Sequence, residues 1–232
     1  MFRQVLIYPV IISVSNYSAL GFIDIACNAL LPLFYSSSVK LGGLGLDPYT
    51  IGLILGSYGL SIGVFQMLFF AKMVRMWGAK KVYMMGLSAF FVMFPLFAVI
   101  NLLARVNGGT TLLVWATVYL QLFFGIIKDM SYGVPCPYQP LLTTYLLLFS
   151  GCIFMYMAAA APNQKSLGAV NGLGQTSVAV FRAIGPASAN SIFALSVKHN
   201  IMGGYGVYLF LVIVTALIVM LGNRLPREPW KD

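Results

Sequence analysis

Four charged side chains stand inside long apolar runs of this sequence. They are Asp24, Lys128, Asp129 and Arg182. A charged group at the centre of a lipid bilayer costs about 2.5 to 3.5 kcal/mol on insertion scales, so it usually faces a bundle interior or a wet cavity and serves ion or proton movement. A carboxylate beside a cation can bind and release a proton as its surroundings change. We therefore take these four residues as candidates for a substrate and proton pathway.

The polar residues around Asp24 follow helical spacing. Successive members are four, three and four positions apart, which places them on one stripe of a helix. The stripe consists of Tyr17, Gly21, Asp24 and Asn28. Asn28 therefore joins the pathway candidates.

A second stripe contains Lys128, and its members are Thr117, Gln121, Gly125, Lys128 and Tyr132. Asp129 follows at once, but adjacent positions point about 100° apart on a helix. Lys128 and Asp129 are thus expected to be poor partners for each other, and Asp24 is the expected partner of Lys128. Gln121, and Gln66 inside another apolar run, complete the set of pathway candidates.

Structural interpretations of these charges stay open. Asp24 could be neutralised by protonation, or be paired only for packing. Arg182 must find an acid or water within its span, and pinning two helices together is as consistent with its position as a role in transport.

The elements that must position these residues are membrane spans. Hydrophobic residues make up 60% of the 232 residues and charged residues only 8%, which is too little polar surface for a soluble globule. The net charge of +9 comes from cations in short loops and at the tail, a pattern typical of orientation in a membrane and not of nucleic-acid binding. Cys27, Cys136 and Cys152 lack metal-ligand spacing, so no disulfide framework, metal site or cofactor is predicted.

The sequence predicts an all-α membrane protein with a six-helix transmembrane bundle, forming a single domain over residues 1–232. The expected spans are about 5–34, 49–71, 82–104, 111–133, 167–197 and 204–222. A short basic loop follows the second span, and such loops are retained in the cytoplasm. Its cations are Lys72, Arg75, Lys80 and Lys81. Both termini are then expected in the cytoplasm.

Small residues predict where two of the spans pack. The second span carries glycines on one face, and in lipid small residues let helices approach closely, so this face is expected to meet another helix of the same bundle. These glycines are Gly52, Gly56, Gly59 and Gly63. In the fifth span, Gly185 and Pro186 predict a bend.

Residues 134–161 do not fit the pattern of continuous spans. Three prolines interrupt any helix there, yet 141–161 alone would pass as another span. A seventh span would put the basic tail opposite the basic loop, so six are preferred and 134–161 is expected to be irregular or an extra helix. The prolines are Pro135, Pro137 and Pro140.

The extra apolar segment at about 134–151 has a further interpretation. Joining Gly133 to Cys152 restores one proline-free helix. We therefore interpret 134–150 as a translated intron, a hypothesis that spliced transcript sequence would test.

Two motifs carry a resemblance to a known family. The loop at 71–81 resembles a degenerate copy of the cytoplasmic Gly-xxx-Asp-Arg-x-Gly-x-Arg-Arg loop of major facilitator superfamily transporters. The matching residues are Gly78, Lys80 and Lys81, and the departing ones are Ala71, Arg75 and Met76. The candidate gating loop consists of Arg75, Gly78, Lys80 and Lys81. The ion pair that gates the less degenerate copy of this loop in the family cannot be assigned to these residues.

The second motif lies at 167–175 and 181–186. Gly172, Gly185 and Pro186 have the spacing of the glycine-proline helix of drug:proton antiporters, and Asn171 adjoins them. In the family this motif lies in the other six-helix half of the transporter. The residues here therefore resemble a second, repeated copy of the motif. Over nearly its whole length the chain resembles the C-terminal six-helix half of such a transporter, closest to fungal members related to zinc-induced facilitator-like and drug:proton antiporter proteins.

The resemblance implies secondary active transport by one half of a twelve-helix transporter. Proton-coupled efflux of a small organic solute or metal complex, at the plasma or vacuolar membrane, is the expected function. The implied partners are the lipid bilayer, the substrate, protons and a missing N-terminal half or second copy. The alternative is a nontransporting truncated membrane protein that only packs with or regulates a partner. An enzyme is not predicted, because no nucleophile, base or metal set is clustered.

Overall fold

Helices make up the regular structure of the chain. The computed structural model describes residues 7–132 and 152–226, and this part contains no strand. The long helices are α2 (Tyr8–Ser36), α3 (Pro48–Trp77), α4 (Ala79–Val106), α5 (Leu112–Asp129), α7 (Leu167–Lys198) and α8 (Gly206–Asn223). The short ones are α6 (Cys152–Ala159) and the 3-10 turns η1 (Val39–Leu41), η2 (Gln164–Ser166) and η3 (Ile201–Gly204).

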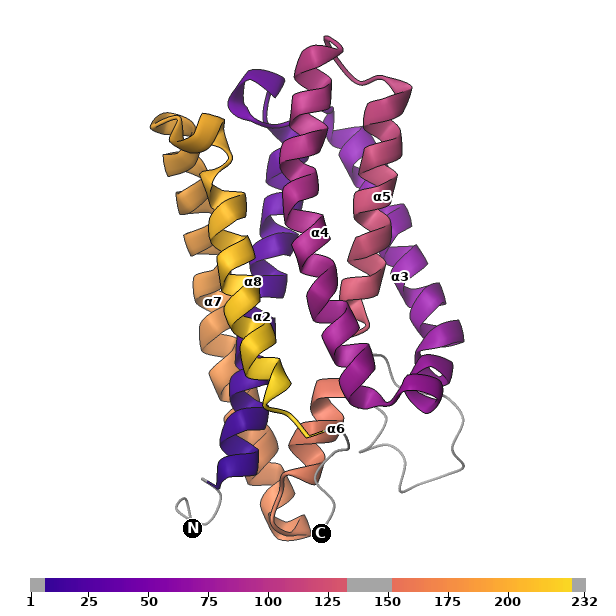
Figure 1. Cartoon of the computed structure of the whole chain (residues 1–232), viewed down its shortest axis with the longest axis vertical. Coiled ribbons are helices and arrows are strands. Elements are labelled where there is room, and N and C mark those ends of the chain that lie inside the picture. The colour runs from indigo at the N-terminus through magenta and orange to yellow at the C-terminus, as the bar shows by residue number, and fades with distance from the viewer. Residues whose placement is uncertain (1–6, 133–151, 227–232) are drawn as a thin grey trace.

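Within the described residues, six helices are long and apolar enough to cross a membrane, namely α2, α3, α4, α5, α7 and α8. They stand roughly side by side along the long axis of the molecule (Figure 1). The predicted all-α bundle of six spans is therefore confirmed. That this bundle is one domain of a longer transporter stays a prediction.

Local sequence determines where α3 begins and ends. The Asp47 carboxylate accepts hydrogen bonds from the Thr50 hydroxyl (2.6 Å) and the Thr50 backbone N–H (2.9 Å), which makes Asp47 the N-cap of the helix. The same two contacts hold the pKa of Asp47 below its ordinary value. Pro48 follows at the first helical position, where its missing N–H is no loss. Gly78, at φ +82°, ends the helix in a conformation that favours glycine.

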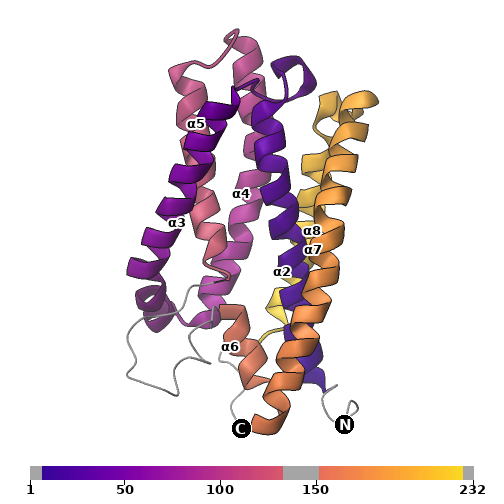
Figure 2. The ribbon, with the colours of Figure 1, turned by 180° about the vertical axis from the view of Figure 1, so that it is seen from behind.

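Helices α2 and α7 lie against each other because glycines permit close approach. A Cβ added to Gly21 would lie 2.2 Å from Val178 Cγ2, and one added to Gly185 would lie 2.4 Å from Ile25 Cγ2. Both helices run from the end where the N-terminus lies towards the opposite end (Figure 2). Helix α7 continues through Pro186, and the bend expected there stays a prediction.

The glycine face of α3 does not pack as expected. All four glycines are exposed, and no described atom lies within 4 Å of a Cβ added to any of them. Within the described residues no other helix meets this face, contrary to the prediction, and any partner outside them stays a prediction. The helix buries larger side chains instead, and two of them, Tyr58 and Gln66, donate hydrogen bonds to Asp129 of α5. The buried residues of α3 are Ile54, Tyr58, Gln66 and Phe70.

Asn171 and Gly172, the start of the second motif, are also exposed. No described atom lies within 4 Å of a Cβ added to Gly172. The described part of the chain therefore shows no helix packed against these two residues, and their expected role in helix packing stays a prediction.

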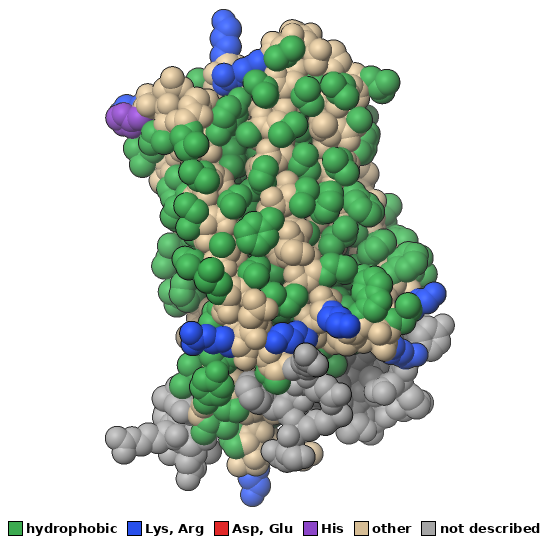
Figure 3. All heavy atoms as spheres, in the orientation of Figure 1, with side chains coloured by type: hydrophobic (Ala, Val, Ile, Leu, Met, Phe, Trp, Pro, Cys, Tyr) green, Lys and Arg blue, Asp and Glu red, His purple; other side chains and the backbone are tan. Residues whose placement is uncertain are grey.

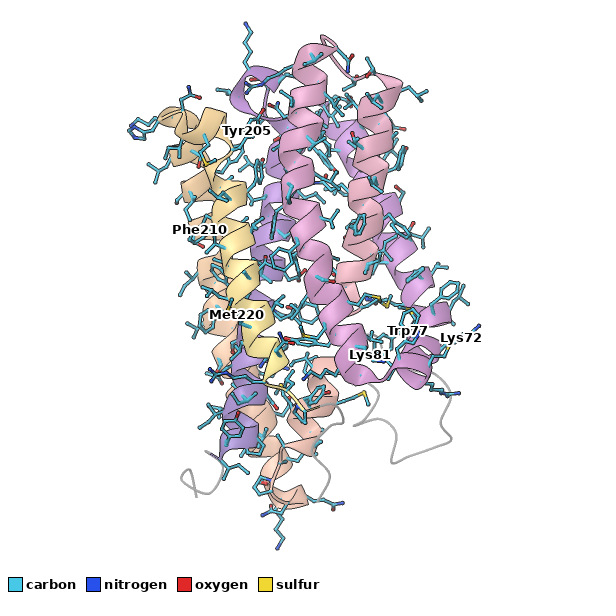
Figure 4. The ribbon with its side chains drawn as sticks, in the orientation of Figure 1. Lys72, Trp77, Lys81, Tyr205, Phe210 and Met220 are labelled. Carbon is cyan, nitrogen blue, oxygen red and sulfur yellow. The ribbon has the colours of Figure 1, made fainter. Side chains whose placement is uncertain are left out.

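The outer face formed by α4, α5 and α8 is largely apolar. Hydrophobic side chains cover its middle, while lysines and arginines gather at the lower edge (Figure 3). On α8, Phe210 is 39% exposed and Met220 66% exposed (Figure 4). An apolar belt of this kind between charged edges is what contact with lipid requires.

Both described ends of the chain lie at the same end of the bundle as the basic loop between α3 and α4 (Figure 1). Lys80 Nζ donates to the backbone oxygen of Asn223 (2.9 Å) and to that of Leu225, which joins the start of α4 to the end of α8. Lys72 and Lys81 lie at this same edge (Figure 4). Because the two described ends lie at the same end of the bundle, the chain between them crosses it an even number of times.

The short helix α6 begins close to the point where α5 ends and continues towards the end that holds the termini (Figures 1 and 2). It packs inwards, because Cys152, Ile153, Tyr156 and Met157 are buried. The Tyr156 hydroxyl donates to Pro226 O at 2.8 Å. Residues 134–151, and with them the intron hypothesis, lie outside the described residues.

A substitution at the α2–α7 contact should destabilise the bundle. Gly185→Val places two methyl groups where a Cβ alone already meets Ile25, and such overpacking costs about 1 to 3 kcal/mol. We expect the unfolding temperature of the purified chain in detergent to fall by several degrees. Gly59→Val, at an exposed glycine of α3, is the matched control. Equal losses in the two variants would contradict the close packing at Gly185.

Candidate functional site

The centre of the site is the ammonium group of Lys128, at the last turn of α5. Its Nζ lies 2.5 Å from Asp24 Oδ1, across the bundle on α2, and 2.8 Å from Asp129 Oδ1. The lysine side chain is 1% exposed, and the two aspartates are 15% and 16% exposed. One buried cation is thus shared between two carboxylates at the edge of the buried region.

The structure confirms one predicted pairing and corrects another. Asp24 is a partner of Lys128, as expected. The prediction that Lys128 and Asp129 would be poor partners is wrong. Asp129 is the last residue of α5, and a lysine side chain is long and flexible, so its ammonium reaches a neighbour whose Cβ points elsewhere.

Asp129 is held from a third helix. The Tyr58 hydroxyl on α3 donates to Asp129 Oδ2 at 3.4 Å, and Gln66 Nε2 donates to the backbone oxygen of Asp129 at 2.9 Å. Gly125 leaves the room for this contact, since a Cβ there would lie 2.3 Å from the Tyr58 hydroxyl oxygen. Helices α2, α3 and α5 therefore meet at one charged cluster, which we define as Asp24, Lys128 and Asp129.

Tyr58 is a site residue that the sequence did not single out. An isolated tyrosine in an apolar span carries no polar periodicity of its own. The sequence feature that could have indicated it is Gly125, on the same helix face as Lys128. A small residue at that position predicts that a large side chain of another helix packs against it.

The charges of the cluster do not cancel. With all groups ionised, the two carboxylates and one ammonium carry a net charge of −1. The lysine is also 5.8 Å from the centre of the Phe90 ring, a favourable position for a cation. A surplus negative charge next to apolar surroundings is stabilised by taking up a proton or another cation. The cluster thus holds one carboxylate more than it holds cations.

Gln121 and Asn28 lie outside the cluster. Gln121 is fully buried, accepts a hydrogen bond from the Tyr35 hydroxyl (3.4 Å) and donates to Met93 O (3.4 Å), so it connects α5 with α2 and α4. Asn28 is exposed one helical turn beyond Asp24 on α2. Their place in a pathway stays a prediction.

Arg182 is exposed near the middle of α7, and its guanidinium carbon lies 5.9 Å from the centre of the Tyr132 ring. No acidic side chain of the described residues forms an ion pair with it. In the candidate gating loop, Arg75 and Lys81 are exposed, Gly78 makes the turn and Lys80 contacts the end of α8. The structure therefore does not bring Arg182 or the loop into the charged cluster.

No group of three or more histidine, cysteine, aspartate or glutamate side chains in the described part of the chain could hold a metal ion. Cys27 and Cys152 are both buried and unbridged. The described site consists of paired charges within a bundle of candidate membrane spans.

The chain is similar in sequence to transporters of the major facilitator superfamily. It is 26% identical to "Major facilitator-type transporter psiT2" of Psilocybe cubensis over 88% of its length, and 28% identical to "Protein ZINC INDUCED FACILITATOR-LIKE 1" of Arabidopsis thaliana over 92%. "Efflux pump azaK" of Aspergillus niger is 22% identical over 88%. These comparisons confirm the resemblance found in the two motifs.

The chain spans only part of these relatives, namely 36% of psiT2, 41% of the Arabidopsis protein and 39% of azaK. No protein-family model and no solved structure matches it. The homologues are named as transporters and not as enzymes, and the six candidate spans agree with an integral, multi-pass membrane protein.

Proposed function

We propose that this chain is the C-terminal half of a secondary transporter that couples the efflux of a small solute to proton movement. The observation that carries the proposal is the Lys128 ammonium, which is buried between two carboxylates from different helices. A site with one surplus negative charge at membrane depth suits a proton that must be bound and released in each cycle.

Asp24 is the proposed proton carrier of the cluster. Asp129 is restrained by Tyr58 and Gln66 in addition to Lys128, whereas Asp24 contacts Lys128 alone among the described hydrogen-bond partners. When Asp24 takes up a proton, Lys128 keeps Asp129 as its counter-ion and no charge is left unpaired. When the proton leaves, Asp24 returns to Lys128.

Alternating access requires a second six-helix half, because such folds bind substrate at the interface of two repeats. The exposed glycines of α3 and the exposed small residues of α7 support a surface that another protein covers. The same observation favours the second candidate function, a membrane protein without transport activity that packs with or regulates a partner.

An efflux measurement in cells separates the two candidates. Cells that make the chain together with its second half should accumulate less of some member of a panel of labelled small solutes than cells lacking the chain. A protonophore, which collapses the proton gradient, should abolish the difference. Accumulation that never depends on the chain would favour the nontransporting candidate.

We further propose that the basic loop and both termini face the cytoplasm. The reason is the concentration of lysines and arginines at that end of the bundle, which the positive-inside rule assigns to the cytoplasm. In a Cys136→Ser background, a cysteine at Arg224 should react with an impermeant maleimide only after the cells are permeabilised. A cysteine at His199, at the opposite end, should react in intact cells. The reverse pattern would overturn the orientation.

A further inference from the structure

Arg182 is the one charged pathway candidate that forms no ion pair in the described part of the chain. It lies near the middle of α7, on an exposed face, with an aromatic ring beside it at 5.9 Å. A guanidinium stays protonated in proteins, so it cannot escape the cost of this position by losing a proton. It must face water or an anion.

The register between α2 and α7 places Arg182 at the level of Asp24. The Tyr17 hydroxyl on α2 donates to Gln175 Oε1 on α7 at 3.3 Å. Asp24 and Arg182 each come seven positions after this pair, and the two helices run in the same direction. Both residues therefore lie about 10 Å further along the bundle, at a similar height.

The contacts between the helices agree with this register. The rings of Phe22 and Phe181 lie 6.4 Å apart, and Gly185 approaches Ile25. Asp24 forms no ion pair with Arg182, because its carboxylate contacts Lys128 at 2.5 Å, and its charge acts on the guanidinium only at longer range. Arg182 thus lies at the level of the charged cluster, on the exposed face of α7, without an ion pair to it.

We infer that Arg182 binds an oxyanion of the transported solute, either a carboxylate or a phosphate, and this inference rests on the proposed transport function. A guanidinium donates two parallel hydrogen bonds to such groups, and the Tyr132 ring centre, 5.9 Å from its carbon, is close enough for a cation–π contact. The Gln175 carboxamide on the same helix lies two turns away and accepts a hydrogen bond from Tyr17. The substrate class is therefore small organic anions, including molecules that also carry a cationic group for the cluster.

Thermal unfolding of the full chain, purified together with its second half in lipid nanodiscs, tests the inference without any transport step. The probes are phenylpropionate, phenyl phosphate and, as the cationic counterpart, phenylpropylamine. A ligand that binds only the folded chain raises the midpoint, by about 2 to 4 °C at several times its dissociation constant. We expect at least one of the two anions to do so, and the larger shift distinguishes carboxylate from phosphate.

Variants assign the shift to one side chain. Arg182→Gln should lose it, Arg182→Lys should keep a reduced shift because a lysine cannot donate in a bidentate manner, and Lys198→Gln, an exposed cation at the end of the same helix, should keep it entirely. No shift with either anion, an undiminished shift in Arg182→Gln, or a shift with the amine alone would overturn the inference. An anion shift that persists while no coupled efflux is found in cells would refute the proposed function and leave the anion site standing.

Discussion

Asp24→Asn should abolish proton-coupled solute movement while the protein still inserts into the membrane. The amide keeps the shape of the carboxylate and cannot take up a proton at physiological pH. Removing a charge from a span also eases insertion, so a lower amount of protein in the membrane is not expected. Because the substitution leaves Lys128 paired with Asp129, the rest of the cluster should remain assembled. The measurement is solute efflux with and without a proton gradient, normalised to the amount of protein in the membrane.

Asp47→Asn is the matched control for this substitution. Asp47 is also a hydrogen-bonded aspartate, but it accepts from Thr50 and caps α3 outside the span, and asparagine is an equally good N-cap. Coupled efflux should be unchanged in this variant. If normally expressed Asp24→Asn protein retained full coupling, Asp24 would have only a structural role.

Lys128→Ala should be the most destabilising single change at the site. It removes the cation of the cluster and leaves Asp24 and Asp129 side by side at 15% and 16% exposure. Breaking a buried ion pair by deleting one partner costs about 3 to 5 kcal/mol, because the remaining charge is stranded. Combining it with Asp24→Asn removes one of the stranded charges, so the double variant should be more stable than Lys128→Ala alone.

A double-mutant cycle in detergent measures this coupling. The two single variants, the double variant and the wild-type chain are unfolded under one set of conditions, and Lys72→Ala, at an exposed lysine of the basic loop, serves as the control for loss of a surface cation. A coupling free energy well above about 0.5 kcal/mol is the expected outcome. Additive losses would dismiss the Asp24–Lys128 interaction as a contributor to stability.

The spans and the Asp24–Lys128 contact could be predicted because each depends on one strong effect. Apolar runs of bilayer length have few alternatives to a membrane helix. A lysine and an aspartate on the polar stripes of two different spans can best satisfy each other inside the bundle. In both cases the local pattern and the global fold require the same arrangement.

The position of Asp129 and of the α3 glycines could not be predicted from helical periodicity. Asp129 ends α5, and a rule for adjacent residues in mid-helix does not limit the reach of the Lys128 side chain there. A glycine face predicts close packing, but it does not say against which chain. In α3 the described neighbours contact the face that carries Tyr58 and Gln66 instead.

Arg182 shows a third limit of the sequence. Its position inside a span predicts a need for an acid or water, yet only the structure shows that the acid at its level, Asp24, is already engaged with Lys128. Hydropathy and periodicity place a charge along a helix, whereas the partner of that charge depends on the register between helices.

Infrared difference spectroscopy of the chain in lipid tests the central claim, that the charged cluster binds the coupling proton, most directly. Lowering the pH should produce the carbonyl band of a protonated carboxylic acid in an apolar environment. This band should be absent in Asp24→Asn and present in Asp47→Asn, since Asp47 is exposed outside the spans and hydrogen-bonded to Thr50. A band of the same size and position in wild type and Asp24→Asn would contradict the claim.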